Sequence, residues 1–149
     1  MLRAFACLLF LTAAVAALAV TASARPADAF TTRANAACGD YYRAVLALPR
    51  PSDLPTLATF MRRAHPLAVQ FAQQLRALHT PAGQASVYRT FVSTVEASNA
   101  LDTRIIAAAG RGDAKRVRTL VAREDELDKT IGVAAMTLRL GVCANPPQA

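Results

Sequence analysis

Few residues in this chain have the types and spacing that enzyme chemistry needs. The 149 residues contain no GxSxG, HExxH, GxxxxGKS/T, GxGxxG or EF-hand pattern. Isolated serines such as Ser86, Ser93 and Ser98 fit helix surfaces or helix packing better than a nucleophile beside a base. The sequence therefore predicts a protein that is not an enzyme.

The acidic residues cluster once, at Glu124, Asp125, Glu126 and Asp128. Acid–base catalysis by a pair of carboxyl groups needs both groups in one cleft, whereas consecutive positions on a helix point in different directions. We expect a solvated helix face, with Glu124 on the apolar stripe of its helix and paired to a neighbouring arginine.

Met61 and His65 are four residues apart and share one face of a predicted helix. Met and His are haem ligands, and helical bundles can hold cofactors in their interior. A small-ligand or haem-binding carrier that uses the bundle interior is therefore the alternative function. A core methionine beside a boundary histidine that precedes Pro66 is the simpler interpretation, so no cofactor is predicted.

Three cysteines are present, and Cys7 lies in the apolar N-terminal segment. Cys38 and Cys143 remain, and outside the cytoplasm two such residues usually form a disulfide. Two buried free thiols are the alternative. Neither cysteine lies in a CxxC motif, and their spacing with the two histidines matches no zinc-finger pattern.

Residues 1–29 have the layout of a secretory signal peptide: Arg3, then an uncharged run of 17 residues over 4–20, then small-residue cleavage patterns. Cleavage is expected after Ala24 or Ala29, which leaves residues 30–149 as a single domain. The predicted location is secreted or extracytoplasmic, in the cell envelope. A run of 17 residues is at the lower limit for a membrane span, so an uncleaved signal anchor that tethers the protein to the membrane is the alternative.

Apolar residues then recur at helical spacing over about 32–48, 52–79, 80–110 and 113–140. Ser52 and Asp113 are expected N-caps, Thr80-Pro81 an expected helix start, and Gly110, Gly112 and Gly141 expected helix ends. Pro66 should bend the second helix near Arg62. These elements predict an all-α fold, an antiparallel up-down four-helix bundle with a short first helix, closed by one disulfide.

Helix lengths constrain how the first helix sits. Cys38 lies about 15 Å before the end of the first helix, and the last helix is about 40 Å long at 1.5 Å per residue. Level helices would leave Cys38 and Cys143 more than about 20 Å apart. We therefore expect an extended linker over 49–53 and a first helix displaced toward the end that carries Cys143, so that the opposite end holds nearer three helices than four.

This layout resembles that of uncharacterised exported bacterial helical proteins. The matching features are a cysteine in the first helix, a Leu-Pro break, a glycine-containing turn and a terminal Gly-x-Cys, here Cys38, Leu48-Pro49, Gly110–Asp113 and Gly141-Val142-Cys143. The likeness covers most of the chain after the leader. The resemblance brings no activity and no catalytic residues.

The charge is unevenly distributed in a chain of formal net charge +7. Residues 43–63 and 102–118, which the predicted topology brings to one end, hold nine basic and three acidic residues, whereas the rest of the chain from residue 30 is balanced. Cations in the first turns of the last helix oppose its dipole. The candidate anion-binding residues are Arg62, Arg63, Arg111, Lys115, Arg116 and Arg118.

The leading functional hypothesis is a non-enzymatic interaction module that binds an anionic envelope component through this basic end. An anionic lipid, an envelope polymer or an acidic protein would suit it. Nucleic acid is not expected, because no aromatic stacking platform accompanies the cations. Ordinary solvation of an arginine-rich surface is the alternative, and the sequence does not predict the oligomeric state.

Overall fold

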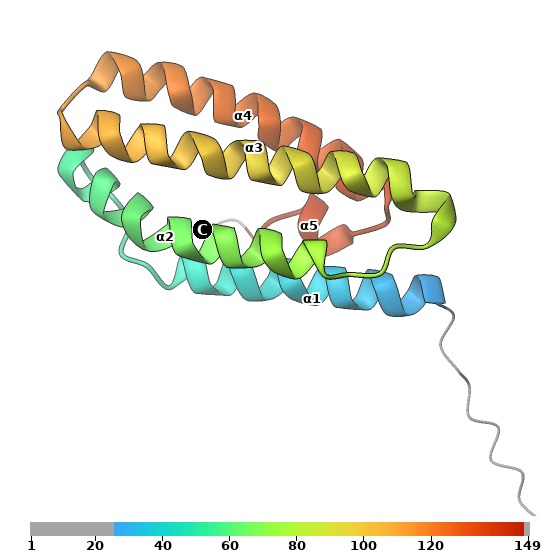
Figure 1. Cartoon of the computed structure of the whole chain (residues 1–149). Helices are drawn as coiled ribbons and strands as arrows, with labels where there is room; N and C mark the ends of the chain where they lie inside the picture. The colour runs from blue at the N-terminus through green and yellow to red at the C-terminus, as the bar shows by residue number, and fades with distance from the viewer. Residues whose placement is uncertain (1–25, 148–149) are drawn as a thin grey trace, which may run out of the picture.

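The computed structural model describes residues 26–147, and this part of the chain is all-helical. Figure 1 shows its long helices side by side, with consecutive ones running in opposite directions. The elements in chain order are α1 Pro26–Leu46, α2 Leu54–Arg76, a 3-10 turn Ala82–Gln84, α3 Ala85–Gly110, α4 Ala114–Thr137 and α5 Gly141–Ala144. Most of the predicted leader, with Cys7 and the Ala24 cleavage site, lies outside the described residues.

We had expected a short first helix, but the observed helix has full length because it begins earlier in the sequence. α1 has 21 residues against 23 in α2, and it starts at Pro26, inside the segment assigned to the leader. Phe30 explains the difference, because its side chain is buried and meets the Tyr88 ring edge-on, with the ring centroids 5.0 Å apart. This contact anchors the first turns of α1 to α3.

Two of the expected helix starts are close to those observed, and one is not. Asp53 rather than Ser52 caps α2, accepting a 2.8 Å hydrogen bond from the Thr56 N–H in a capping box. Asp113 caps α4 as expected, with a 2.9 Å bond from the Arg116 N–H. Pro81 does not begin a helix: its backbone is extended, and a 3-10 turn separates it from α3.

Two helices end in the same hydrogen-bonded motif, built on different residues. After α3, Gly112 has φ +72°, and the Asp113 N–H donates to the Ala108 carbonyl at 3.0 Å. After α4, Arg139 takes that position with φ +59°, and the Leu140 N–H donates to the Ala135 carbonyl at 2.8 Å. Both are Schellman motifs, in which glycine is the usual residue at the left-handed position.

The expectation that Gly141 ends the fourth helix was therefore wrong. Leu140 is fully buried, because the turn of the chain at Arg139 places the Leu140 side chain in the core. Burial of a leucine stabilises by about 1.5–3 kcal/mol, which offsets the cost of about 1–2 kcal/mol for a non-glycine residue in the left-handed region. Gly141 instead begins α5, a helix that the sequence pattern did not predict.

The buried apolar residues form two clusters, and α1 contributes to only one. The three-helix core joins α2, α3 and α4 through Ala58, Leu101, Ile105, Ala108, Ala109, Val117 and Leu120. The disulfide core contains Phe30, Ala34 and Cys38 of α1 together with residues of α2, α3, α4 and the C-terminal segment. Residues 49–52 have no helix or turn. The expected displacement of the first helix is thus confirmed. The second helix, α2, bends in the half that precedes Pro66, as expected (Figure 1).

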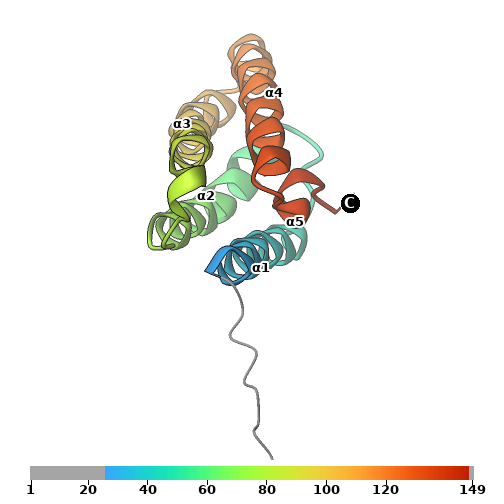
Figure 2. The same cartoon turned by 90° about the vertical axis from the view of Figure 1, so that its right-hand side faces the viewer.

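The short α5 lies between α1 and α4 (Figure 2). The predicted disulfide is present, joining Cys38 of α1 to Cys143 of α5 with their Cα atoms 5.3 Å apart. Around it, the Tyr42 hydroxyl donates to the Cys143 carbonyl at 3.2 Å, and the Val142 N–H donates to the Asn35 side chain at 2.9 Å. α1 packs on α2 and α5, so α5 fills part of the space that separates α1 from α4.

The disulfide indicates an oxidising, extracytoplasmic environment. None of the helices within residues 26–147 combines the length and apolar character that a membrane crossing requires.

Candidate functional site

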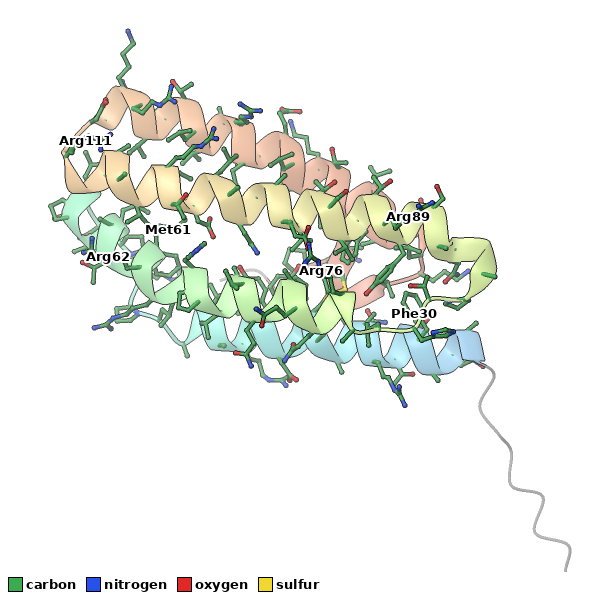
Figure 3. The ribbon with its side chains drawn as sticks, in the orientation of Figure 1. Phe30, Met61, Arg62, Arg76, Arg89 and Arg111 are labelled. Carbon is green, nitrogen blue, oxygen red and sulfur yellow. A yellow bond between two sulfur atoms is a disulfide. The ribbon has the colours of Figure 1, made fainter. Side chains whose placement is uncertain are left out.

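The six candidate anion-binding residues all have exposed side chains. We call them the basic pole: Arg62, Arg63, Arg111, Lys115, Arg116 and Arg118. Figure 3 shows Arg62 and Arg111 at the end where α2 begins and α3 ends, whereas Arg76, Arg89 and Phe30 lie away from it. This is the end that contains the three-helix core.

The acidic side chains of the same segments are all engaged elsewhere. Asp53 and Asp113 serve as N-caps, and Asp102 is buried with one carboxylate oxygen 3.2 Å from His65 Nδ1. The ion pairs within residues 26–147 include no member of the basic pole: they are Arg43–Asp40, His65–Asp102, Arg76–Glu96 and Lys129–Glu126. In this part of the chain the six cations therefore have no carboxylate partner.

The helix N-termini at this end contribute less to an anion site than the sequence suggested. The Asp53 side chain already accepts the Thr56 N–H, and the Asp113 side chain already accepts the Arg116 N–H. Each capping carboxylate also places a negative charge at the positive end of its helix dipole. The attraction for an anion therefore comes from the arginine and lysine side chains.

Met61 and His65, the candidate haem ligands, have different neighbours. Met61 packs against the three-helix core, while the Nδ1 atom of His65 faces Asp102. Across the described helices no three His, Cys, Asp or Glu side chains gather as metal ligands would.

The structure also contains a cavity that the sequence analysis missed. It has a volume of about 320 Å³ and lies between α1, α2, α3, α4 and α5, beside the disulfide. Four aromatic rings and two carboxylates line it, from Tyr41, Tyr42, Phe71, Phe91, Glu124 and Asp128. The expectation that this acidic cluster forms only a solvated face was thus wrong for Glu124, which is half-buried. Asp128 also lines the cavity but is exposed, and Asp125 and Glu126 are exposed and do not line it.

The expected arginine partner of Glu124 is also absent from the described ion pairs. Its carboxylate instead faces Ser98, with the Ser98 hydroxyl 3.5 Å away, and lies near Asp102 and Asp128. Partial burial, followed by repulsion from these two carboxylates, raises the pKa of Glu124 from 4.5 to about 7. Burial also raises the pKa of Asp102 and of Asp128, with the neighbouring carboxylates adding to the effect at Asp128.

The two tyrosines of α1 share this environment. Burial is the main cause that raises the pKa of Tyr41, and the charges of Asp102, Glu124 and Asp128 add to it. Burial likewise raises the pKa of Tyr42, whose hydroxyl is held on the Cys143 carbonyl. Both tyrosines are therefore neutral hydrogen-bonding groups at physiological pH.

One sequence signal could have indicated the cavity. Glu124 and Asp128 are four residues apart, so they occupy one face of α4, and the sequence already placed Glu124 on the apolar face. Phe71, Tyr41 and Asp102 come from other helices, and their approach depends on how the helices pack.

Comparisons with known proteins give no relative for this chain: no family model matches it, and neither do the curated proteins or the solved structures.

Proposed function

We propose that the protein is an exported, non-enzymatic, up-down four-helix bundle whose basic pole binds an anionic lipid surface of the cell envelope. The main observation that supports this proposal is that the six cations are exposed and have no carboxylate partner within residues 26–147. Residues 1–29 would direct export, and the disulfide suits an oxidising compartment.

The arrangement of charges favours a surface over a single small anion. The six residues come from the first turns of α4, the loop before it and the middle of α2, and none of them lines the main cavities within residues 26–147. A basic residue near an anionic membrane contributes about 1 kcal/mol, and salt screens the attraction. Several such residues on one end of a rigid bundle give measurable, salt-sensitive binding without any apolar insertion.

Co-sedimentation with vesicles tests the proposal. The oxidised protein, purified after export, is mixed with phosphatidylglycerol-containing or pure phosphatidylcholine vesicles over a salt series. We expect binding to the anionic vesicles alone, lost at high salt. Replacing Arg111, Lys115, Arg116 and Arg118 with glutamine should weaken it at least 100-fold, given about 1 kcal/mol for each charge.

A matched variant separates position from net charge. Replacing Arg33, Arg89, Arg123 and Arg139 with glutamine removes the same charge from exposed positions away from the basic pole. It should weaken binding far less. If the two variants lost equal affinity for the vesicles, net charge alone would explain the binding and the position of the basic pole would not matter. Absence of binding at low salt would refute the proposal. Binding to an envelope polymer or an acidic protein in place of vesicles would retain the basic pole but change its partner.

A second candidate function, a small-ligand carrier, is favoured by the cavity beside the disulfide. Its haem form would use Met61 and His65, neither of which lines that cavity. A visible absorption spectrum of the protein purified after export tests the haem form, because a bound haem gives a Soret band.

A further inference from the structure

We propose that the cavity enclosed by α1, α2, α3, α4 and α5 binds a small organic cation, a protonated amine or quaternary ammonium group carried on an apolar body. The proposal rests on the second candidate function, a small-ligand carrier, and names the chemistry of its ligand. It does not depend on the basic pole, which lies toward the other end of the bundle.

The cavity exists because α1 and α4 are held apart. α1 packs on α2 and α5, and α5 lies between α1 and α4 (Figure 2). Side chains of both α1 and α4 line the cavity. The disulfide fixes this spacing at one side. The volume of about 320 Å³ is at the small end of ligand cavities.

Aromatic rings form the apolar part of the cavity wall. Tyr41 and Phe71 are stacked, with ring centroids 4.8 Å apart and planes 9° apart, and Tyr42 lies against Tyr41 at 5.6 Å. Phe91 lines another part of the wall. Such rings bury an apolar ligand body and attract a cation through their π-electron faces.

The charged part of the wall is entirely acidic. Of the titratable groups that face the cavity, α1 supplies Tyr41 and Tyr42, and α4 supplies Glu124 and Asp128. Asp102 of α3 is close enough to repel Glu124, and its His65 partner on α2 does not line the cavity. No lysine, arginine or histidine within residues 26–147 lines this cavity.

A wall with acidic but no basic side chains favours a ligand of positive charge. An anion would add repulsion to carboxylates that already repel one another, and a neutral ligand would displace water from them without compensation. A cation relieves both penalties. A metal ion fits poorly, because the described residues include no group of three metal-ligating side chains, whereas an organic cation also uses the aromatic wall.

Protonation of Glu124 should control the affinity. Because its pKa is raised to about 7, the carboxylate gains its charge as the pH rises through neutrality. A cation then binds more tightly at pH 8 than at pH 5. If binding requires this charge, the affinity falls about tenfold for each pH unit below 7, by about 100-fold at pH 5.

A ligand series on the oxidised full domain tests the proposal by NMR titration. The probes are benzylammonium, which stays protonated from pH 5 to 8, its neutral counterpart benzyl alcohol, and the anion benzoate. We expect benzylammonium to shift the resonances of Tyr41, Tyr42 and Ser98, to bind at least tenfold more tightly than benzyl alcohol, and to weaken from pH 8 to pH 5. Benzoate should not bind.

Two variants locate the charge that is responsible. Glu124→Gln should weaken the binding of benzylammonium at least tenfold and flatten the pH dependence of that binding, while leaving the affinity for benzyl alcohol unchanged. Asp125→Asn, an exposed neighbour on the same helix, removes an equal charge and should change neither. Circular dichroism checks that both variants are folded, and the comparison of probes on the unaltered protein needs no variant.

Each other result counts against the proposal in a different way. Equal binding of benzylammonium and benzyl alcohol would refute the cationic class and leave a small-ligand carrier. Absence of binding by all three probes at millimolar concentration would refute the carrier as well. Benzylammonium binding that Glu124→Gln does not change would place the site elsewhere. None of these results affects vesicle binding by the basic pole.

Discussion

Replacing Glu124 with glutamine should stabilise the folded protein above about pH 4.5, and by the full amount at neutral and higher pH. Glutamine has nearly the shape of glutamate and can keep the contact with the Ser98 hydroxyl. It removes the charge that burial and the neighbouring Asp102 and Asp128 carboxylates make unfavourable. The variant therefore isolates the electrostatic cost of this one carboxylate.

The sign of the effect follows from the two states of the carboxyl group. In the unfolded chain Glu124 loses its proton near its ordinary pKa of 4.5, whereas in the folded protein it keeps the proton until about pH 7. Below pH 4.5 both states are protonated and Glu124 carries no electrostatic cost. Between the two values only the folded state holds the proton, so the free energy of unfolding falls as the pH rises. Above pH 7 the full cost is present.

The magnitude is limited by the same two values. A difference of two and a half pH units, at about 1.4 kcal/mol for each, sets a ceiling of about 3 kcal/mol. Glu124 is only partly buried, so solvent screening reduces this to about 1–2 kcal/mol. We expect Glu124→Gln to raise the free energy of unfolding by that amount at pH 8 and by less than about 0.5 kcal/mol at pH 4.5.

Urea unfolding followed by circular dichroism at pH 4.5 and pH 8 measures the difference. Asp125→Asn is the matched control, because Asp125 is exposed on the same helix and should change the stability little at either pH. A Glu124→Gln variant that is less stable than the unaltered protein at pH 8 would refute the reasoning. It would show that the carboxylate has favourable partners that outweigh its burial.

Three further predictions test other parts of the fold. Arg139→Gly should raise the thermal midpoint by about 2–4 °C in calorimetry, because glycine adopts the φ of +59° without strain; a lower midpoint would show that the arginine side chain stabilises the turn. Replacing Cys38 and Cys143 together with serine should cost about 4–5 kcal/mol in urea unfolding, and an unchanged midpoint would contradict this. N-terminal sequencing of the exported protein should begin at Arg25, because cleavage after residue 29 would place a charged ammonium group on Phe30, which is only 3% exposed; a first residue of Phe30 would contradict it.

The sequence predicted well those features that depend on a few neighbouring residues. Asp113 caps α4 because its own carboxylate reaches the Arg116 N–H three residues on. Gly112 ends α3 because glycine adopts positive φ without a steric cost. The displaced first helix was also predictable, since it follows from helix lengths and from the need to bring Cys38 to Cys143.

Features that depend on the packing of separate segments were not predictable in the same way. Arg139 adopts the left-handed conformation because Leu140 gains a buried position, and no local pattern indicates that position. Glu124 and Asp128 line a cavity because α3 and α4 are rotated so as to bring Asp102 near, and because α5 separates α4 from α1. The pattern of one helix does not specify such a rotation.

The bond between Cys38 and Cys143 also determines how the protein carries a mechanical load. It closes α2, α3 and α4 into a covalent ring that spans 105 residues of sequence separation. A pull applied to the two ends of the chain passes from one sulfur atom to the other and bypasses this ring. Only the segments outside residues 38–143 lengthen under such a pull. A molecule stretched between an N-terminal membrane anchor and a C-terminal attachment would therefore keep α2, α3 and α4 unextended until a reductant opened the ring.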